Sequence, residues 1–223
     1  MSYRFKLLVF VLLALGVLFA FNVGNSALNT LSRLNVVEAE RDQWQRPANV
    51  LQALDVRPGN TVADLGCGSG YFTVKLSSAV GRTGLVLAED IRRLPLAFLW
   101  LRTLGKGNHN ISIIHGEPDD PGFPVDRVNE VLIANTYHEL TDPQRVLAHV
   151  RRSLVAGGRL VVVDRAPAPA NGQKGEIVGH DIAASRVEIQ LRQAQFDIVR
   201  RQDDFIQNDP YHENWWLIVA RKP

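Results

Sequence analysis

The sequence has few of the residues that would fix a fold by covalent or metal cross-links. Its 223 residues include one cysteine, Cys67, so an internal disulfide and a four-cysteine metal site are both excluded. No internal repeat and no low-complexity tract stands out. Apolar residues make up 46% of the chain and charged residues 22%, which is typical of a packed core and excludes collagen-like and disordered chains.

A charge excess of one sign is also missing from most of the chain. The formal net charge is +2, and Arg4 and Lys6, the charged residues of the segment 1–26, account for it. Residues 27–223 carry 23 basic and 23 acidic side chains. Nucleic-acid-binding domains usually carry a basic excess, so we expect no nucleic-acid partner.

One long apolar run is present, at residues 7–21, and no acidic residue precedes it. Its fifteen residues fall between the roughly 17–25 of a membrane-spanning helix and the roughly 7–15 of a signal-peptide core. We expect residues 1–26 to be a membrane anchor, with an exported chain after signal cleavage and a buried core helix as alternatives. Arg4 and Lys6 favour a cytoplasmic N-terminus, which would put the rest of the chain on the other side of the membrane. This bias can be overridden, so the side on which the rest of the chain lies stays open.

The rest of the chain reads as one domain, residues 47–223, preceded by a linker and short helix at 27–46. Strand-like apolar runs occur at 61–65, 85–89, 111–115, 130–134, 159–164, 197–200 and 215–220. Helical stretches are expected at 47–55, 70–80, 92–104, 142–154 and 180–194. This alternation predicts a doubly wound, mostly parallel, seven-stranded Rossmann-like α/β sheet. Such sheets bind ligands at the carboxyl ends of their strands.

A glycine-rich turn from Asp64 to Gly70 (DLGCGSG) separates the first of these strands from the next helix. Alternating glycines allow positive φ and a close approach of backbone to a ligand, and the helix start offers free N–H groups. The dinucleotide fingerprint G-x-G-x-x-G fails, because Tyr71 stands where its last glycine would be. Asp64 would repel a pyrophosphate but not a ligand with a positive amino group. The turn predicts ligand binding, with a plain strand–helix turn as the alternative.

This turn resembles the first motif of the class I S-adenosylmethionine-dependent methyltransferases. The resemblance implies that Asp64 lies near the amino group of the methionine part, and that Gly66, Gly68 and Gly70 pass beneath the nucleoside. Asp90, at the end of the second strand, matches the acid that binds both ribose hydroxyls. An NAD site also uses an acid about twenty residues after its last glycine, and a strand-end turn residue is a further alternative for Asp90.

Later segments resemble small-molecule methyltransferases of the quinone-biosynthesis type and related bacterial proteins of unassigned substrate. Asp119, and next Asp120, match the loop that contacts adenine, with two turn-capping aspartates as the alternative. Asn135 follows the fourth strand and belongs to the predicted cofactor-binding set. Residues 154–160 resemble the family's L-x-P-G-G-x-L turn, with Ala156 in place of proline. The N-P-P-Y signature of DNA amino-methyltransferases is absent from the sequence.

Methyl transfer from a sulfonium needs a base only where the acceptor must lose a proton. Tyr137, His138 and Glu139 follow the fourth strand, where the methyl group should point, and a histidine titrates near neutrality. The alternative is that these residues line the pocket without proton transfer. His180 is a fourth catalytic candidate, with a helix cap beside Asp181 as the alternative.

We therefore expect an enzyme that transfers a methyl group from S-adenosylmethionine to a small-molecule or lipid-like acceptor. A membrane-tethered module that binds S-adenosylmethionine without catalysis, and an NAD-dependent oxidoreductase, remain as alternatives. No metal site is expected. The helix expected at 92–104 is apolar on every side from Leu94 to Leu101, which indicates a membrane-facing or partner-covered patch, with burial under the N-terminal segment as the alternative.

Overall fold

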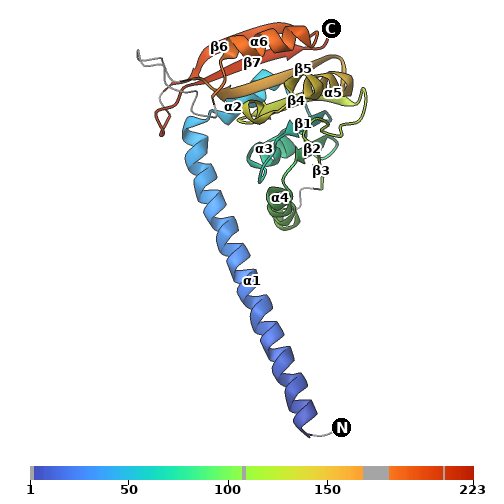
Figure 1. Cartoon of the computed structure of the whole chain (residues 1–223), viewed down its shortest axis with the longest axis vertical. Helices are drawn as coiled ribbons and strands as arrows, with labels where there is room; N and C mark the ends of the chain where they lie inside the picture. The colour runs from blue at the N-terminus through green and yellow to red at the C-terminus, as the bar shows by residue number, and fades with distance from the viewer. Residues whose placement is uncertain (1–2, 107–108, 168–180, 208) are drawn as a thin grey trace. The chain divides into compact units, whose positions relative to one another are not determined.

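The computed structural model describes residues 3–106, 109–167, 181–207 and 209–223. Its contacts divide the chain into two compact units, Met1–Arg41 and Asp42–Pro223, whose elements are coloured in chain order in Figure 1.

A single helix, α1 (Tyr3–Trp44), makes up the described part of the first unit, and its last three residues are counted with the second unit. The sequence predicts a linker and a short helix at 27–46, but the chain is one continuous helix as far as Trp44. No glycine or proline lies between Gly24 and Pro47, and good helix formers recur there, so no local signal ends the helix.

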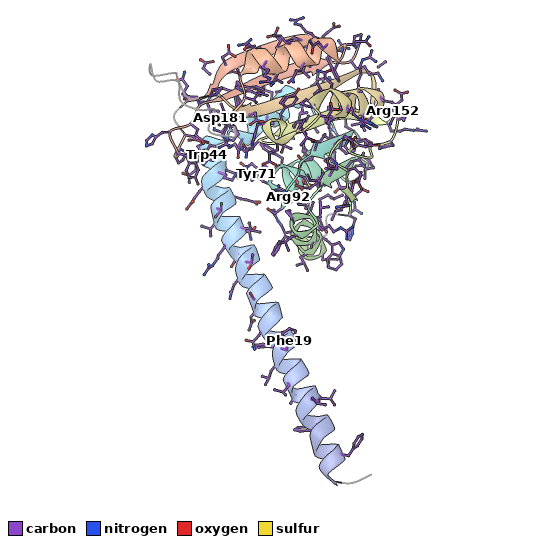
Figure 2. The ribbon with its side chains drawn as sticks, viewed as in Figure 1. Phe19, Trp44, Tyr71, Arg92, Arg152 and Asp181 are labelled. Atoms are coloured by element: carbon purple, nitrogen blue, oxygen red, sulfur yellow. The ribbon has the colours of Figure 1, made fainter. Side chains whose placement is uncertain are left out.

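The apolar run in α1 leaves large side chains exposed. Phe19, labelled in Figure 2, has 72% of its surface exposed. The membrane-spanning anchor expected for residues 1–26 is not confirmed, since no helix in the described part of the chain is both long and apolar enough to cross a membrane.

The second unit alternates strands and helices, as the sequence predicts. Its helices are α2 (Pro47–Leu54), α3 (Tyr71–Val80), α4 (Arg93–Lys106), the short 3₁₀ turn η1 (Tyr137–Glu139), α5 (Pro143–Ser153) and α6 (Ala184–Gln193). Its strands are β1 (Thr61–Leu65), β2 (Leu85–Asp90), β3 (Ile111–His115), β4 (Val128–Ala134), β5 (Leu154–Arg165), β6 (Asp197–Ile206) and β7 (Trp215–Arg221).

The strands form one mixed sheet in the order β3-β2-β1-β4-β5-β7-β6. The first five pair in parallel, whereas β7 lies antiparallel to both β5 and β6. The predicted seven-stranded, mostly parallel α/β sheet is therefore confirmed. From β1 the strand order runs to β2 and β3 on one side and to β4 and β5 on the other. Doubly wound sheets bind their ligands at such a reversal of strand order.

Helices cover both faces of the sheet (Figure 1). One core cluster joins apolar residues of α2 and α3 to the sheet, and a second joins those of α5 and α6 to its other face. Val86 of β2 packs in the first cluster, and Ala88 packs against α4. Because alternate strand residues share a face, α4 lies on the same face as α3.

Helix α4 is buried on one side only. Leu96 and Leu99 pack inside with at most 6% of their surface exposed. Leu94 and Leu104 are more than 60% exposed, and Trp100 is 53% exposed. The helix that the sequence shows as apolar all round therefore presents an apolar outer face.

Candidate cofactor and active site

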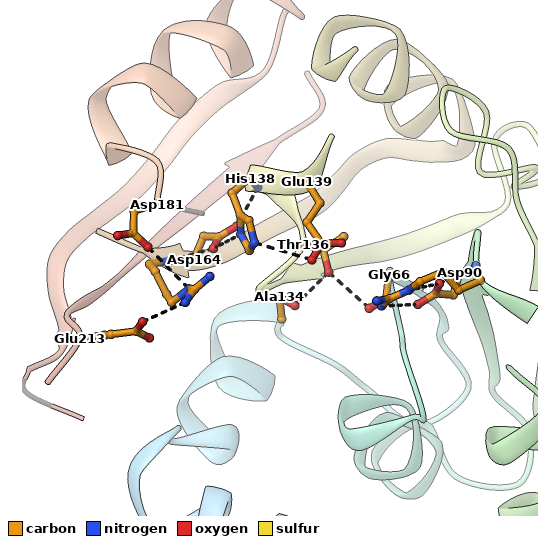
Figure 3. A network of polar contacts seen from close by, with 11 residues as sticks. Gly66, Asp90, Ala134, Thr136, His138, Glu139, Asp164, Asp181 and Glu213 are labelled. Carbon is orange, nitrogen blue, oxygen red and sulfur yellow. Dashed lines mark hydrogen bonds and ion pairs between the residues drawn. The ribbon is translucent and has the colours of Figure 1, made fainter. Parts of the chain in front are cut away.

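A cavity opens at the carboxyl ends of β1, β2 and β4, next to the glycine-rich turn. Gly66, Asp90 and Thr136, which mark these three strand ends, are labelled in Figure 3. The lining residues are Leu65, Gly66, Glu89, Asp90, Ile91, Arg92, Glu117, Pro118, Pro121, Thr136, Glu139, Leu140, Thr141 and Val146. Four of them are acidic and one is basic, so the cavity suits a ligand with positive charge and hydroxyl donors.

The three predicted glycines all adopt positive φ, but for different reasons. A Cβ on Gly66 would collide with the side chain of Thr136, whose hydroxyl donates to the Gly66 carbonyl at 3.3 Å. Gly70 is the N-cap residue just before α3, and a Cβ there would press on Leu99. A Cβ on Gly68 would meet no heavy atom within 4 Å. Gly66 and Gly70 are thus required by packing, and Gly68 leaves open space.

Asp90 faces the glycine-rich turn from the end of β2. Its carboxylate is 2% exposed and accepts hydrogen bonds from the Gly68 N–H at 3.0 Å and the Arg92 N–H at 2.8 Å. The Arg92 guanidinium also donates to it, with Nε at 3.2 Å. The Arg92 side chain is 59% exposed, so displacing it would cost little. Asp90 is placed to accept from hydroxyl groups of a ligand.

Glu89 is a buried acid of the cavity that the sequence reading did not single out. It is 2% exposed, and its Oε2 accepts from the Gly66 N–H at 3.3 Å. A Cβ on Gly116 would overlap its carboxyl group, so that glycine makes room for it. Burial, together with the nearby carboxylates of Asp90 and Asp64, raises the pKa of Glu89 to about 8. Burial thus favours the protonated form of Glu89 at neutral pH.

This raised pKa makes the free energy of unfolding depend on pH. The folded chain keeps the Glu89 proton up to about pH 8, whereas the unfolded chain loses it near the ordinary pKa of about 4.3. The stability that protonated Glu89 contributes at low pH is therefore lost as the pH rises from about 4.3 to about 8. The free energy of unfolding falls by at most about 1.4 kcal/mol per pH unit in this range. We expect Glu89→Gln to flatten the fall in stability, as measured by urea unfolding from pH 5 to 9.

Glu130 on β4 offers a matched comparison. Burial also raises its pKa to about 8, but it lies outside the cavity lining. Glu130→Gln should remove a similar pH slope, and only Glu89→Gln should also change the response to a ligand in the cavity. If the free energy of unfolding of Glu89→Gln changes with pH in parallel with that of the wild type, the expectation is wrong.

Asp64 is buried but lies outside the cavity lining. Its Oδ2 accepts from the hydroxyl of Thr73, on α3, at 2.6 Å. It thus ties the end of β1 to the helix that follows the glycine-rich turn. Cys67, between the glycines, is buried as well, and burial raises the pKa of its thiol, which disfavours a reactive thiolate.

The two aspartates predicted for adenine binding also lie outside the lining. Asp119 pairs with Arg145 of α5 at 2.7 Å, and Asp120 lies 3.1 Å from His149 of the same helix. Glu117 contributes to the cavity from this turn, together with two prolines. The sequence located the loop, and the fold decided which of its residues line the cavity.

The residues that follow β4 differ in burial and in the groups that they contact. Asn135 is exposed and left-handed, with φ of 54°, and lies outside the lining. Tyr137 is 1% exposed, its hydroxyl donates to Gln190 of α6 at 3.0 Å, and burial raises its pKa. Glu139 lines the cavity. Of these three residues, only Glu139 has direct access to a ligand there.

His138 is held by an acid that the sequence reading missed. Its Nδ1 lies 2.8 Å from Oδ1 of Asp164, at the end of β5 (Figure 3). Its Nε2 lies 3.8 Å from Oε1 of Glu139. The position of Asp164, at the carboxyl end of a buried strand, was the available signal. His180 lies outside the described residues.

Known proteins resemble this chain over the segment that contains the cavity residues. The family model of the ubiE/COQ5 methyltransferase family matches residues 27–171. The ubiquinone/menaquinone biosynthesis C-methyltransferase UbiE of Ectopseudomonas mendocina is 34% identical over 122 residues, which cover 54% of this chain and 47% of the relative. The demethylmenaquinone methyltransferase of Staphylococcus saprophyticus is 28% identical over 131 residues, covering 58% and 54%. The chain thus matches about half the length of these curated relatives.

Solved structures share the fold. A SAM-dependent methyltransferase from Aquifex aeolicus matches with a TM-score of 0.72 and 22% identity, covering 86% of this chain and 98% of that one. The geranyl diphosphate C-methyltransferase of Streptomyces coelicolor matches with a TM-score of 0.69 and 15% identity, covering 80% of each chain. With the sheet order, the glycine-rich turn and the family match over residues 27–171 in agreement, the chain belongs to the ubiE/COQ5 methyltransferase family.

Proposed function

We propose that this protein transfers a methyl group from S-adenosylmethionine to a small-molecule acceptor of the quinone type. The observation that carries the proposal is the acidic cavity beside the glycine-rich turn, with Gly66, Asp90 and Glu139 in its wall. Membership of the ubiE/COQ5 methyltransferase family supports both the cofactor and the reaction.

The residues of the cavity fit S-adenosylmethionine. Asp90 would accept hydrogen bonds from the ribose hydroxyls once Arg92 turns away, and the open space over Gly68 lets backbone approach the nucleoside. The acidic wall stabilises the positive charge of a sulfonium and an ammonium group. The same wall opposes the pyrophosphate of NAD, which disfavours the oxidoreductase alternative.

The bound cofactor would supply an activated methyl group on a positively charged sulfur. The chain's own contribution is to bind, orient and exclude water, which provides much of the rate of such a transfer. Glu139 and the neighbouring His138 are the described residues of the candidate catalytic set that lie at the cavity or beside it.

The acceptor class follows from the relatives. Two of them are named for ubiquinone/menaquinone biosynthesis and for demethylmenaquinone. We therefore propose a reduced quinone ring, which offers a nucleophilic carbon next to an acidic hydroxyl group, as the methyl acceptor.

Two measurements on the full chain test this proposal. S-adenosylmethionine at 100 times its dissociation constant should stabilise the fold by about 2.7 kcal/mol, which a thermal-shift assay would detect, and NAD should not. With a reduced, short-chain demethylmenaquinone, the protein should release S-adenosylhomocysteine. A thermal shift without turnover on a panel of quinols, phenols and lipids would favour a module that binds S-adenosylmethionine without catalysis. No shift at all would contradict both the methyltransferase and the binding module.

We also propose that the chain associates with a membrane through its N-terminal helix. The support is the set of exposed apolar side chains in α1: Phe10, Leu12, Leu13, Leu15, Val17, Leu18, Phe19 and Phe21. The outer face of α4 offers a second apolar surface, with Trp100 and no acidic residue in the helix. The side of the membrane, and export after cleavage of the leader, are left open.

Flotation with anionic vesicles tests the membrane proposal. The full chain should float, and Phe19→Ser with Phe21→Ser should reduce the floating fraction more than Leu94→Ser with Trp100→Ser. Equal binding by all three chains would count against apolar attachment at either helix.

A further inference from the structure

Glu89 is a buried acid of the cavity wall to which the proposed function gives no role. It lies near the end of β2, is 2% exposed, and belongs to the cavity lining. Its backbone is held as well, because the Cys67 N–H donates to the Glu89 carbonyl at 2.8 Å. A buried polar group is costly unless its hydrogen bonds are made, so the contacts of this carboxyl group show what it can offer a ligand.

The two carboxyl oxygens of Glu89 have different surroundings. Oε2 accepts a hydrogen bond from the Gly66 N–H at 3.3 Å. Oε1 lies against Gly116, where a Cβ would overlap it, and the described part of the chain makes no hydrogen bond to it. Gly66 and the residues that follow Gly116 line the cavity on either side. Oε1 is thus the oxygen left for a ligand.

The groups around this carboxyl group oppose a negative charge on it. Within the described ranges no cation pairs with Glu89, and Arg92, the basic residue of the lining, is bonded to Asp90 at 3.2 Å. Its neighbour on β3 is the uncharged Ile114. The other titratable groups near it, from β1, the glycine-rich turn, β2, the turn after β3, and η1, are Asp64, Cys67, Asp90, Glu117 and Glu139.

Glu89 is therefore a neutral acid at neutral pH. Burial, together with the like charges, raises the pKa of Glu89 to about 8. A protonated carboxyl group has one O–H donor and one carbonyl acceptor. Because the Gly66 N–H already donates to Oε2, the carbonyl is best placed at Oε2 and the hydrogen at Oε1.

Apolar side chains make up much of the remaining cavity wall. They come from the end of β2, the turn after β3, the segment after η1, and α5, and they are Ile91, Pro118, Pro121, Leu140 and Val146. A flat heteroaromatic ring buries its faces against such a wall and meets polar groups at its edge. The ring nitrogens of adenine are hydrogen-bond acceptors at that edge, and an O–H group is the donor that matches them.

We propose that Glu89 recognises the adenine of S-adenosylmethionine as a neutral acid, with its Oε1–H donating to a ring nitrogen of the base. This inference rests on the proposed function and adds a specificity-determining residue to it. An ionised Glu89 has only acceptors to offer, and these would repel the lone pair of the ring nitrogen. Binding of the base therefore needs the protonated form and weakens at high pH.

The test uses 5′-methylthioadenosine, which carries adenine and ribose but no amino or carboxyl group that titrates. Isothermal titration calorimetry on the full chain should show about tenfold weaker binding at pH 9 than at pH 7, with uptake of nearly one proton at pH 9. Glu89→Gln can donate from its amide instead, so it should bind about as tightly as the wild type at pH 7 and equally well at pH 9. Glu130→Gln, at an acid with a similarly raised pKa outside the cavity lining, should keep the wild-type pH dependence.

The wild-type measurements decide the question even if Glu89→Gln fails to fold. Binding of the probe that is as tight or tighter at pH 9, without proton uptake, overturns the inference, and so does loss of the pH dependence in Glu130→Gln. If S-adenosylmethionine binds but the wild type and Glu89→Gln respond to pH alike, Glu89 is not the donor and the proposed function stands. If neither ligand binds the wild type at pH 7, the proposed function itself is wrong.

Discussion

Replacing Gly66 with alanine is expected to lower the free energy of unfolding by about 3 kcal/mol or more and to remove the stabilisation by S-adenosylmethionine. Gly66 has φ of 71°, where a Cβ costs about 1–2 kcal/mol. That Cβ would also overlap the side chain of Thr136, including its Cβ at 2.8 Å, and overpacking of this kind costs about 1–3 kcal/mol more. Urea unfolding and a thermal-shift assay would measure the two effects.

Gly68→Ala is the matched control for this change. Gly68 also has positive φ, at 56°, but its new Cβ would meet no heavy atom within 4 Å. The backbone strain of about 1–2 kcal/mol should remain and the overpacking should be absent. If the two variants unfold at the same urea concentration, the contact between Gly66 and Thr136 does not constrain the turn as argued.

Replacing Asp90 with alanine is expected to weaken S-adenosylmethionine binding about 100-fold or more. A hydrogen bond to a charged group contributes about 1.5–3 kcal/mol, and Asp90 would accept from two ribose hydroxyls. The change also releases the Gly68 N–H, which the carboxylate holds at 3.0 Å. Isothermal titration calorimetry would give the dissociation constant directly.

Two further variants separate the carboxylate from its neighbours. Arg92→Ala removes the guanidinium but keeps the Asp90 carboxylate, and should bind the cofactor as tightly as the wild type or more tightly. Asp119→Ala tests the adenine contact predicted from the sequence, and its place outside the cavity lining leads us to expect a small effect. A weak effect of Asp90→Ala together with a large effect of Asp119→Ala would reverse the proposed order of importance.

Much of the fold was predictable because its signals are local. The strands β1 and β3 coincide with the predicted ranges, and the other five overlap theirs. Alternation of buried strands and helices restricts such a chain to a doubly wound sheet. The sequence does not predict that α1 extends through the stretch expected as a linker and short helix, because a polar composition suggests a linker even where no glycine or proline breaks the helix.

The candidate site was predictable in part. Gly66, Asp90 and Glu139 were expected from spacing and family resemblance, and the structure places all three in one cavity wall. Asp119 and Asp120 pair with α5 instead, since a sequence cannot show which side of a turn a neighbouring helix covers. Their role in adenine binding stays a prediction.

The sequence by itself determined the elements and the glycine-rich turn, because these depend on neighbours within a few residues. Only the tertiary structure decided which acids meet at the cavity. The register of β1 against β2 sets Leu65 opposite Glu89 and so brings that carboxyl group to Gly66. The pairing of β4 with β5 joins His138 to Asp164 across 26 residues. Pairings of this kind depend on burial of the whole sheet, and no local pattern specifies them.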